Sequence, residues 1–543
     1  MAAPALAQVQ ALAESKLEKP TAPWVGTRNY ISKVFGRADT QVTLEGPVRL
    51  RDYVLNGKLE LSLKAYLDLV LANNTDLALQ RLTLLTPMNA IQRAFSIFDP
   101  TLTASFSAAR SLTPATNTLV GAAVLSSLSQ PFSVQVSENV FTGGSVYSSF
   151  NMAKYSSNNS FYLYNPSYSG QLQFGFSQPL LRRRGAYITR LPITIARVQK
   201  KTADLNYESY LMGYVARAEN AYWDVIAARE NIKVLEQALA LADESLKRAR
   251  QEIQLGATSE LEIFQPEQNY ATAKINLTQA QYQLTAVEDV LRRFIGADLD
   301  PEVRKLPVVL TEKVETNLDE TPFDREALVT AAGERRPDLK VQRVQVESAD
   351  LTIAQDLDNL KPQLTLNGSY STYGRGGPTY VTAPDGTSVF VPGGIGGAYG
   401  MLFGFGYPTY QMGLSLNFPM KDRNAAANLA DAMVNKKTQV LQVRQAEQQV
   451  RQDVLTAITN VERSRASVQL AKVVVDYSVK RAEADKKRYD LGTITLFFLL
   501  SSQSDLTTAQ SLLVNNMVQH RRNVLALQQS LGTLLDEKGI VVQ

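Results

Sequence analysis

The segment 409-TYQMGLSLNF-418 alternates strictly between apolar and small polar side chains and contains no charge. The apolar set is Tyr410, Met412, Leu414, Leu416 and Phe418. Such a pattern is typical of a transmembrane β-strand, which faces lipid on one side and water on the other. A half-buried sheet of a soluble protein alternates in the same way, so this segment alone leaves both interpretations open.

Three further segments, 101–109, 171–178 and 363–370, show the same uncharged alternation. Long insertions rich in Ser, Asn, Gly and Tyr, residues 110–170 and 371–408, separate the paired segments and suit extracellular loops. The lack of charge on the polar face favours the membrane interpretation. The sequence therefore predicts four transmembrane strands in each chain.

Four strands cannot close a barrel, and open strand edges are not tolerated in lipid. The chain is therefore expected to oligomerise. Three copies would form a 12-stranded barrel that is wide enough for a passage, whereas two copies would form eight strands whose side chains largely fill the interior.

The chain is also built from two repeats. A shift by 262 positions places Asp76 and Leu77 on Asp338 and Leu339, and a shift by 236 places Gly256 on Gly492. The two shifts differ because the first half is longer between positions 103 and 221. The predicted organisation is an N-terminal extension (1–59), repeat 1 (60–300), a Pro-containing linker (301–321), repeat 2 (322–535) and a C-terminal tail (536–543).

Each repeat contains a very long helical hairpin. Residues 193–253 contain no Pro and only Gly213, so about 60 residues can form one helix of about 90 Å. Apolar residues recur at alternating spacings of three and four, which is typical of antiparallel coiled coils. The apolar stripes are Ile232, Leu235, Leu239, Ala242, Leu246, Ala249 and Ile253, and on the returning helix Tyr270, Ala273, Leu277, Ala280, Leu284, Val287, Leu291 and Phe294. A soluble rod would explain these stripes equally well, but it has no use for membrane strands.

Composition excludes several classes of protein. The chain has no Cys, one His and a net charge of +4, so it lacks disulfides and thiolate metal sites, and nothing suggests nucleic-acid binding. The solitary His520 is interpreted as a helix-surface residue. With no phosphate-binding loop and no metal-ligand cluster, the chain is not expected to be an enzyme or to need a cofactor. Residues 5–7 (ALA) are interpreted as the remnant of a signal-peptide cleavage site, although Ala-rich sequence also matches by chance.

The motifs and their order resemble the TolC-like outer-membrane factors. Residues 73–77 (NNTDL) and 335–339 (RRPDL) resemble paired helix openings of the family, and 221–224 (AYWD) and 178–181 (QPLL) resemble two further motifs. The resemblance covers about residues 60–535. It implies a homotrimer in the outer membrane, with a 12-stranded barrel and a helical periplasmic tunnel. A periplasmic adapter and an inner-membrane pump are the implied partners, and the pump supplies the energy.

The resemblance also implies candidate functional residues at the two helical turns. The expected adapter contacts are Leu255, Gly256, Ala257, Leu491, Gly492 and Thr493. The expected constriction contains Glu262, Tyr489, Phe498 and Ser501. At the positions of the family's acidic pore residues, this chain has Phe498 and Ser501. A hydrophobic gate is therefore one interpretation of the run 497-FFLL-500, and packing inside the coiled coil is the other.

These observations predict a passive exit duct for small molecules or proteins. The alternative is a coiled-coil structural protein that is anchored in the outer membrane and transports nothing.

Overall fold

The computed structural model describes Tyr30 and residues 48–115, 120–256, 259–313, 322–384 and 386–541. Ala257 and most of the N-terminal extension lie outside these ranges. The chain divides into two compact units, of which the first contains Met1–Thr86, Thr202–Arg343 and Leu441–Gln543, and the second Pro87–Lys201 and Val344–Val440. The four helices α5, α7, α10 and α12 each contribute residues to both units.

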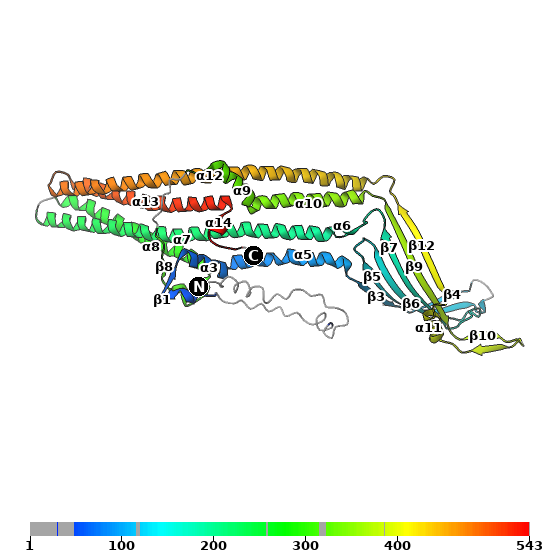
Figure 1. Ribbon diagram of the computed structural model, residues 1–543. Coiled ribbons are helices and arrows are strands. Elements are labelled where there is room, and N and C mark those ends of the chain that lie inside the picture. The colour runs from blue at the N-terminus through cyan, green and yellow to red at the C-terminus, as the bar shows by residue number, and fades with distance from the viewer. Residues whose placement is uncertain are drawn as a thin grey trace, which may run out of the picture. The chain divides into compact units, whose positions relative to one another are not determined.

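Most of the first unit is helical (Figure 1). None of the described helices is both long enough and apolar enough to cross a membrane. The α-helices of the described chain are α3 (Leu63–Asn73), α4 (Thr75–Thr83), α5 (Leu85–Phe95), α6 (Ala186–Thr189), α7 (Leu191–Gln254), α8 (Phe264–Phe294), α9 (Arg325–Arg335), α10 (Pro337–Asn359), α11 (Ile395–Phe403), α12 (Arg423–Asp490), α13 (Leu496–Leu531) and α14 (Leu534–Glu537).

The two long hairpins, α7 with α8 and α12 with α13, form as the sequence predicts. The predicted 193–253 helix is the 64-residue α7. Its stripe residues Ala242, Leu246 and Ala249 are at most 5% exposed, which is the burial expected of a coiled-coil seam. The turns contain Gly256 and Gly492, both with positive φ, a backbone conformation that glycine adopts without strain.

The repeated helix openings bind neighbouring helices in both halves. The Asn74 side chain caps α4 by accepting hydrogen bonds from the Asp76 and Leu77 amides, while its own amide donates to the Phe294 carbonyl on α8. In the second half, the Arg336 guanidinium bonds Asp338 and reaches Asp453 on α12 at 2.9 Å. The same motif therefore joins an opening helix to a long helix twice.

A small sheet contributes buried residues to the core of the first unit. It consists of β1 (Val54–Leu55), β2 (Lys58–Leu61) and β8 (Val308–Leu310), in the order β1-β2-β8. Leu59 and Leu61 are at most 1% exposed, and the Tyr222 hydroxyl donates to the Leu61 carbonyl at 3.1 Å. The described end of the N-terminal extension and part of the linker are thus packed elements.

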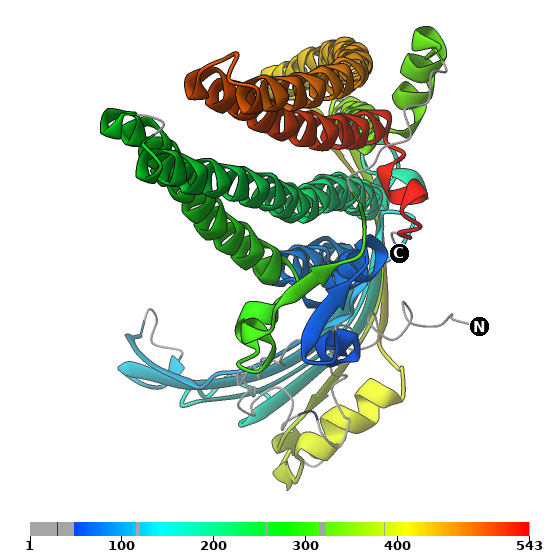
Figure 2. The same ribbon diagram turned by 90° about the vertical axis from the view of Figure 1, so that its left-hand side faces the viewer.

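The second unit contains a seven-stranded antiparallel sheet, curved as Figure 2 shows. Its order is β12-β9-β7-β6-β5-β3, and β4 also pairs with β5. The strands are β3 (Thr101–Phe106), β4 (Ala109–Pro114), β5 (Val124–Asn139), β6 (Ser145–Ser157), β7 (Ser167–Pro179), β9 (Gln363–Gly376) and β12 (Pro408–Asn417).

All four predicted strand segments are strands, but the sheet holds seven strands where the sequence predicts four. Residues 110–170, expected to be an extracellular loop, contain most of β4 and the hairpin β5–β6, so the sequence did not predict these strands. The alternation of β5 is interrupted because Ser126, Gln130 and Glu138 stand on the face that holds its apolar residues. On β6, Tyr147 stands on the polar face, so neither strand carries a clean period-2 signal.

The second insertion, 371–408, does contain separate elements. Strands β10 (Thr379–Thr382) and β11 (Ser388–Val391) pair only with each other in the described residues. The apolar helix α11 packs on the convex side of the large sheet (Figure 2), where the Thr372 hydroxyl donates to the Leu402 carbonyl at 3.4 Å. Leu402 and Ala398 are fully buried in this contact.

Candidate docking tips and constriction

The two helical turns expose an apolar side chain at matching places in the repeats. Leu255 is 83% exposed and Leu491 is 78% exposed. Beyond the adjoining residues of the chain, no described atom lies within 4 Å of the position that a Cβ would take at Gly256 or Gly492. The Thr493 hydroxyl is bonded to the Arg488 carbonyl at 2.9 Å and finishes its helix. The tips are therefore open surfaces of the kind that the predicted adapter contact requires, and Ala257 lies outside the described residues.

A polar network joins the two hairpins close to these turns. Arg248 on α7 forms an ion pair with Asp490 on α12 and bonds Glu252 at 3.0 Å. Its guanidinium lies 4.7 Å from the centre of the Tyr489 ring. The Tyr489 hydroxyl donates to Glu252 at 2.8 Å. Arg248 thus contacts the second hairpin both through its ion pair with Asp490 and through the Tyr489 ring.

The acceptor for Tyr489 is Glu252, whereas the predicted constriction contains Glu262. Glu262 is exposed and contributes to the environment of Tyr489 through its charge. Burial, followed by the hydrogen bond to Glu252, raises the pKa of Tyr489 to about 12. The hydroxyl therefore stays protonated and remains a donor at neutral pH. The spacing of Arg248 and Glu252 by four residues on a helix is the signal that could have pointed to this pair.

The run 497-FFLL-500 divides into two parts at the start of α13. Phe497 and Phe498 are 58% and 55% exposed, and their ring centres are 5.7 Å apart. Leu499 and Leu500 are 5% exposed and are therefore buried within the chain. Ser501 is half-buried. Leu499 and Leu500 therefore follow the packing interpretation, whereas Phe498 projects from its own chain.

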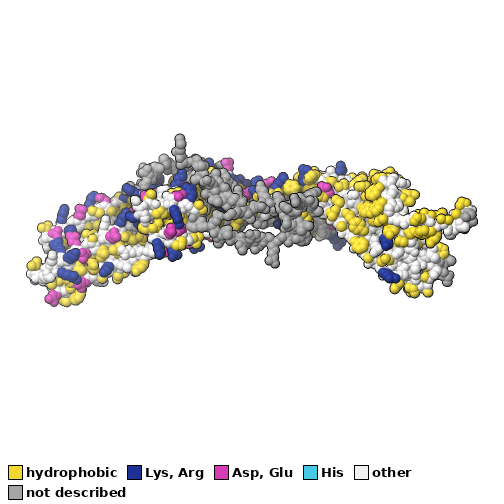
Figure 3. Space-filling view, turned by 90° about the horizontal axis from the view of Figure 1, so that it is seen from below, with side chains coloured by type: hydrophobic (Ala, Val, Ile, Leu, Met, Phe, Trp, Pro, Cys, Tyr) yellow, Lys and Arg dark blue, Asp and Glu magenta, His cyan; other side chains and the backbone are white. Residues whose placement is uncertain are grey.

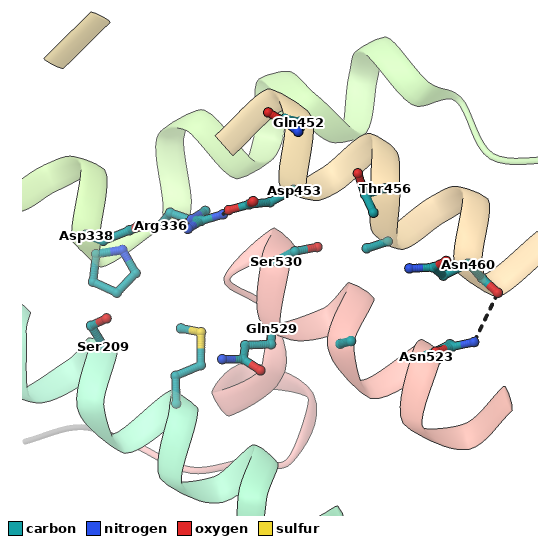
Figure 4. A pocket seen from close by; sticks show the side chains of 14 residues that line it. Ser209, Arg336, Asp338, Gln452, Asp453, Thr456, Asn460, Asn523, Gln529 and Ser530 are labelled. Atoms are coloured by element: carbon teal, nitrogen blue, oxygen red, sulfur yellow. Dashed lines mark hydrogen bonds and ion pairs between the residues drawn. The ribbon is translucent and has the colours of Figure 1, made fainter. Parts of the chain in front are cut away.

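The charged residues of the helix openings line a groove of about 480 Å³ (Figure 4). Arg336 lies between Asp338 and Asp453, so its charge is neutralised inside the groove. Asn523 donates to the Asn460 carbonyl at 3.1 Å across the other side. Because these groups bind one another, the groove is a polar packing gap between helices.

The prediction for His520 was wrong. The side chain is 5% exposed, and its Nδ1 lies 3.0 Å from the Ser464 hydroxyl on α12. Burial, with the charges of Arg521 and Arg465, lowers the pKa of His520. The helix α13 is covered on more than one side, so a polar residue on it need not face solvent.

The large sheet has one apolar and one polar face. Hydrophobic side chains gather over it and few charged side chains appear there, in contrast to the helices (Figure 3). On β12, Met412 and Leu414 lie opposite Gly368 and Leu366 on one face, and Gln411 and Ser415 lie opposite polar partners on the other. The seven strands hold charged residues only at Arg110, Glu138, Lys154 and Arg375.

A doubled helical hairpin combined with such a two-faced sheet is the fold of TolC-like outer-membrane channels. The description of the outer membrane efflux protein family matches residues 163–297 and 328–533. The chain belongs to this family, so the predicted TolC-like fold of long helices and strands, the outer-membrane location and the non-enzymatic channel function are confirmed at that level.

Individual relatives are distant in sequence. Outer membrane protein TolC of Vibrio cholerae serotype O1 is 22% identical over 67% of this chain and 76% of the relative. TolC of Escherichia coli K12 is 24% identical over 63% of this chain and 66% of the relative. The crystal structure of the Campylobacter jejuni CmeC outer membrane channel aligns with a TM-score of 0.60 at 16% identity, covering 95% of this chain and 94% of that one. The structure of CusC aligns with a TM-score of 0.62 at 13% identity, covering 91% and 95%.

Proposed function

We propose that this protein is the exit duct of a tripartite efflux or type I secretion system and that it works as a homotrimer. The duct is passive: an inner-membrane pump supplies the energy, and a periplasmic adapter contacts the tips around Gly256 and Gly492. The named relatives are outer-membrane proteins, among them a toluene efflux pump component of Pseudomonas putida.

The observation that carries this proposal is the pair of free edges of the two-faced sheet. Among the described strands, β12 pairs only with β9, and β3 and β4 pair only with β5. An unpaired edge is costly in lipid because its amides and carbonyls lack partners. Since β3 and β12 run in opposite directions, β12 of one copy can pair antiparallel with β3 of the next and close a ring.

The tips support the adapter contact. Leu255 and Leu491 expose apolar surface at equivalent turns, and such surface is a common feature of docking sites. In a trimer, three copies of each turn would surround the end of the passage. An adapter with a matching apolar groove would cover six turns at once.

Single-channel recording in planar bilayers tests the proposal. The purified protein should have the mass of three chains of 59.8 kDa each, before the detergent contribution, and should yield discrete, reproducible conductance steps. It should migrate as a heat-modifiable trimer from the outer-membrane fraction. Folded trimers that never conduct would favour the anchored coiled-coil alternative, and a soluble monomer would contradict both.

A further inference from the structure

We infer that the β5–β6 hairpin is a membrane-spanning part of the wall, so that each chain contributes six strands and a trimer forms an 18-stranded ring. This inference rests on the proposed homotrimeric duct. It replaces the 12-stranded ring expected from four strands per chain, and it makes the outer opening wider than that of a 12-stranded barrel.

The seven strands of the sheet make six positions in the wall. Strands β3 and β4 both pair with β5 and keep one register on it, from Thr101↔Ser137 through Phe106↔Phe132 to Ala109↔Ser129. They are therefore two parts of a single interrupted strand. The wall positions in order are β12, β9, β7, β6, β5 and the combined β3–β4.

The hairpin lies inside the sheet, between β3 and β7. Strand β5 pairs with β3 over its C-terminal half, and with β6 from Ser127↔Ser157 to Asn139↔Ser145. Strand β6 pairs in turn with β7 over eleven residue pairs. No described residues pair β3 directly with β7. The hairpin therefore cannot fold outward as a loop without separating the sheet into two parts.

The hairpin also continues both faces of the sheet. On one face, Phe132 lies opposite Phe106 and Met152, and Val134 lies opposite Phe150. A row through this face runs across strands of both repeats and consists of Ala104, Val134, Phe150, Leu172 and Thr372, of which Thr372 is covered by the apolar helix α11. An apolar face that continues across strands from both repeats is expected of a surface that meets lipid.

The opposite face of the hairpin is polar, and its side chains form hydrogen bonds between neighbouring strands. The Ser105 and Ser133 hydroxyls are 2.7 Å apart, and those of Thr101 and Ser137 are 2.9 Å apart. On the other side of the hairpin, Gln173 on β7 donates to the Tyr147 hydroxyl at 3.2 Å. Uncharged polar side chains in this arrangement are typical of a face that lines water.

Two charges mark the limits of the apolar face on the hairpin. Glu138 pairs with Val146 near one end, and Lys154 stands eight residues further along β6. Eight residues of strand span about 26 Å, or about 20 Å along the membrane normal at a tilt of about 40°. This is close to the ~25 Å apolar band of outer-membrane barrels.

The hairpin β10–β11 illustrates what a loop hairpin looks like in this chain. In the described residues it pairs with no strand of the large sheet, and its apolar side chains project on both sides, with Tyr380 69% exposed and Val389 50% exposed. The hairpin β5–β6 has the opposite properties, namely pairing on both sides and one apolar face.

Two added strands preserve the geometry needed for closure. Because six is an even number, β3 and β12 still run in opposite directions and can pair between copies. At a strand spacing of about 4.8 Å and a tilt of about 40°, 12 strands enclose a backbone radius of about 12 Å and 18 strands about 18 Å. The wall would thus resemble that of the wide, water-filled porins in strand number.

Cysteine accessibility tests whether the β5–β6 hairpin lies in the membrane. The chain has no Cys, so an introduced cysteine is labelled without background from other thiols. Gln135 and Val136 are both exposed in the single chain, so only the membrane distinguishes them. In proteoliposomes, Gln135→Cys should react with a charged, membrane-impermeant maleimide, and Val136→Cys should react about tenfold more slowly until detergent denaturation.

A reference pair on β12, Gln411→Cys and Met412→Cys, separates the two ways to fail. If this pair alternates while Gln135→Cys and Val136→Cys react alike, the hairpin lies outside the membrane and the six-strand wall is refuted. If neither pair alternates, the membrane duct itself is refuted.

Cryo-electron microscopy of the wild-type trimer then counts the strands directly, with 18 expected and 12 contradicting the inference. Deletion of 124–157 should reduce the ring to 12, whereas deletion of 379–391, which removes the loop hairpin, should leave 18. If the first deletion does not fold, the wild-type count still decides.

Discussion

Removal of the Arg248 side chain should loosen the contact between the two hairpins at the tips. Arg248→Met keeps much of the volume and removes the ion pair with Asp490, the bond to Glu252 and the contact with the Tyr489 ring. If the closed tip depends on this network, the channel should open more often. The membrane wall and the seams of the coiled coils should be unaffected, because these contacts of Arg248 involve no strand.

The expected magnitude follows from the exposure of the groups. The side chains of Arg248 and Asp490 are 38% and 44% exposed, so their pairing contributes about 0–1 kcal/mol. The cation–π contact adds about 0.5–1 kcal/mol. A total of about 1.5 kcal/mol per protomer corresponds to about a tenfold change in the ratio of closed to open tips.

Single-channel recording measures this ratio as open probability. Lys247→Met is the matched control, because it removes the same charge one residue away and breaks an ion pair with Asp243 on the same helix. An unchanged open probability in Arg248→Met, or an equal rise in both variants, would refute a role for the contact between hairpins. Trimer melting temperatures of the two variants should agree with the wild type.

Four further variants test other parts of the chain. Gly256→Val or Gly492→Val should impair export in a cell assay while the trimer stays intact, because Val is strained at positive φ and this strain is confined to an exposed tip. Loss of membrane assembly would contradict this. Phe498→Asp should raise conductance and cation selectivity if three Phe498 rings line the passage, whereas unchanged conductance would place them elsewhere. Burial raises the pKa of Asp338, but the Arg336 hydrogen bond and charge outweigh it and leave that pKa lowered. This stabilisation is present above about pH 4 and is lost as the pH falls further, so Asp338→Asn should melt lower at pH 7 and lose less stability in acid; parallel melting curves would exclude the effect.

The helical part of the fold could be predicted almost completely because its signal is local. A heptad stripe such as Ala242, Leu246 and Ala249 can be identified from the spacing of apolar residues along one helix. The Gly256 and Gly492 turns follow from backbone sterics alone. Such features require no knowledge of distant contacts.

The polar contacts at the tips could not be predicted in the same way. Tyr489 was identified from the family resemblance, yet its acceptor is Glu252, which lies 237 residues earlier. His520 was placed at the surface because it is polar, and its partner Ser464 lies on a helix that buries it. Both outcomes depend on how the long helices pack, and a single sequence does not contain that information.

The β5–β6 hairpin of the first repeat was missed for a different reason. Interruption of the alternation at Ser126 and Gln130 makes β5 resemble a polar loop. Gln130 lies opposite Lys154, and the continuous apolar surface comes from Phe132 and Val134, which face apolar partners on both neighbouring strands. Face continuity is a property of the assembled sheet, and a strand-by-strand pattern search cannot detect it.

The strand insertion also explains how one repeat could grow while both helical hairpins kept the same arrangement. A single additional strand before β7 would reverse the direction of β7, and α7 would then begin at the opposite end of the sheet from α12. Two strands restore the direction, so the second unit can gain wall only in hairpins. The segment Val124–Ser157 is longer than the net excess of the first repeat because the second repeat has its own added elements, β10, β11 and α11. The number of strands in the wall and the length of the helices can therefore change independently in this fold. A chain can gain strands without altering the contacts between its long helices.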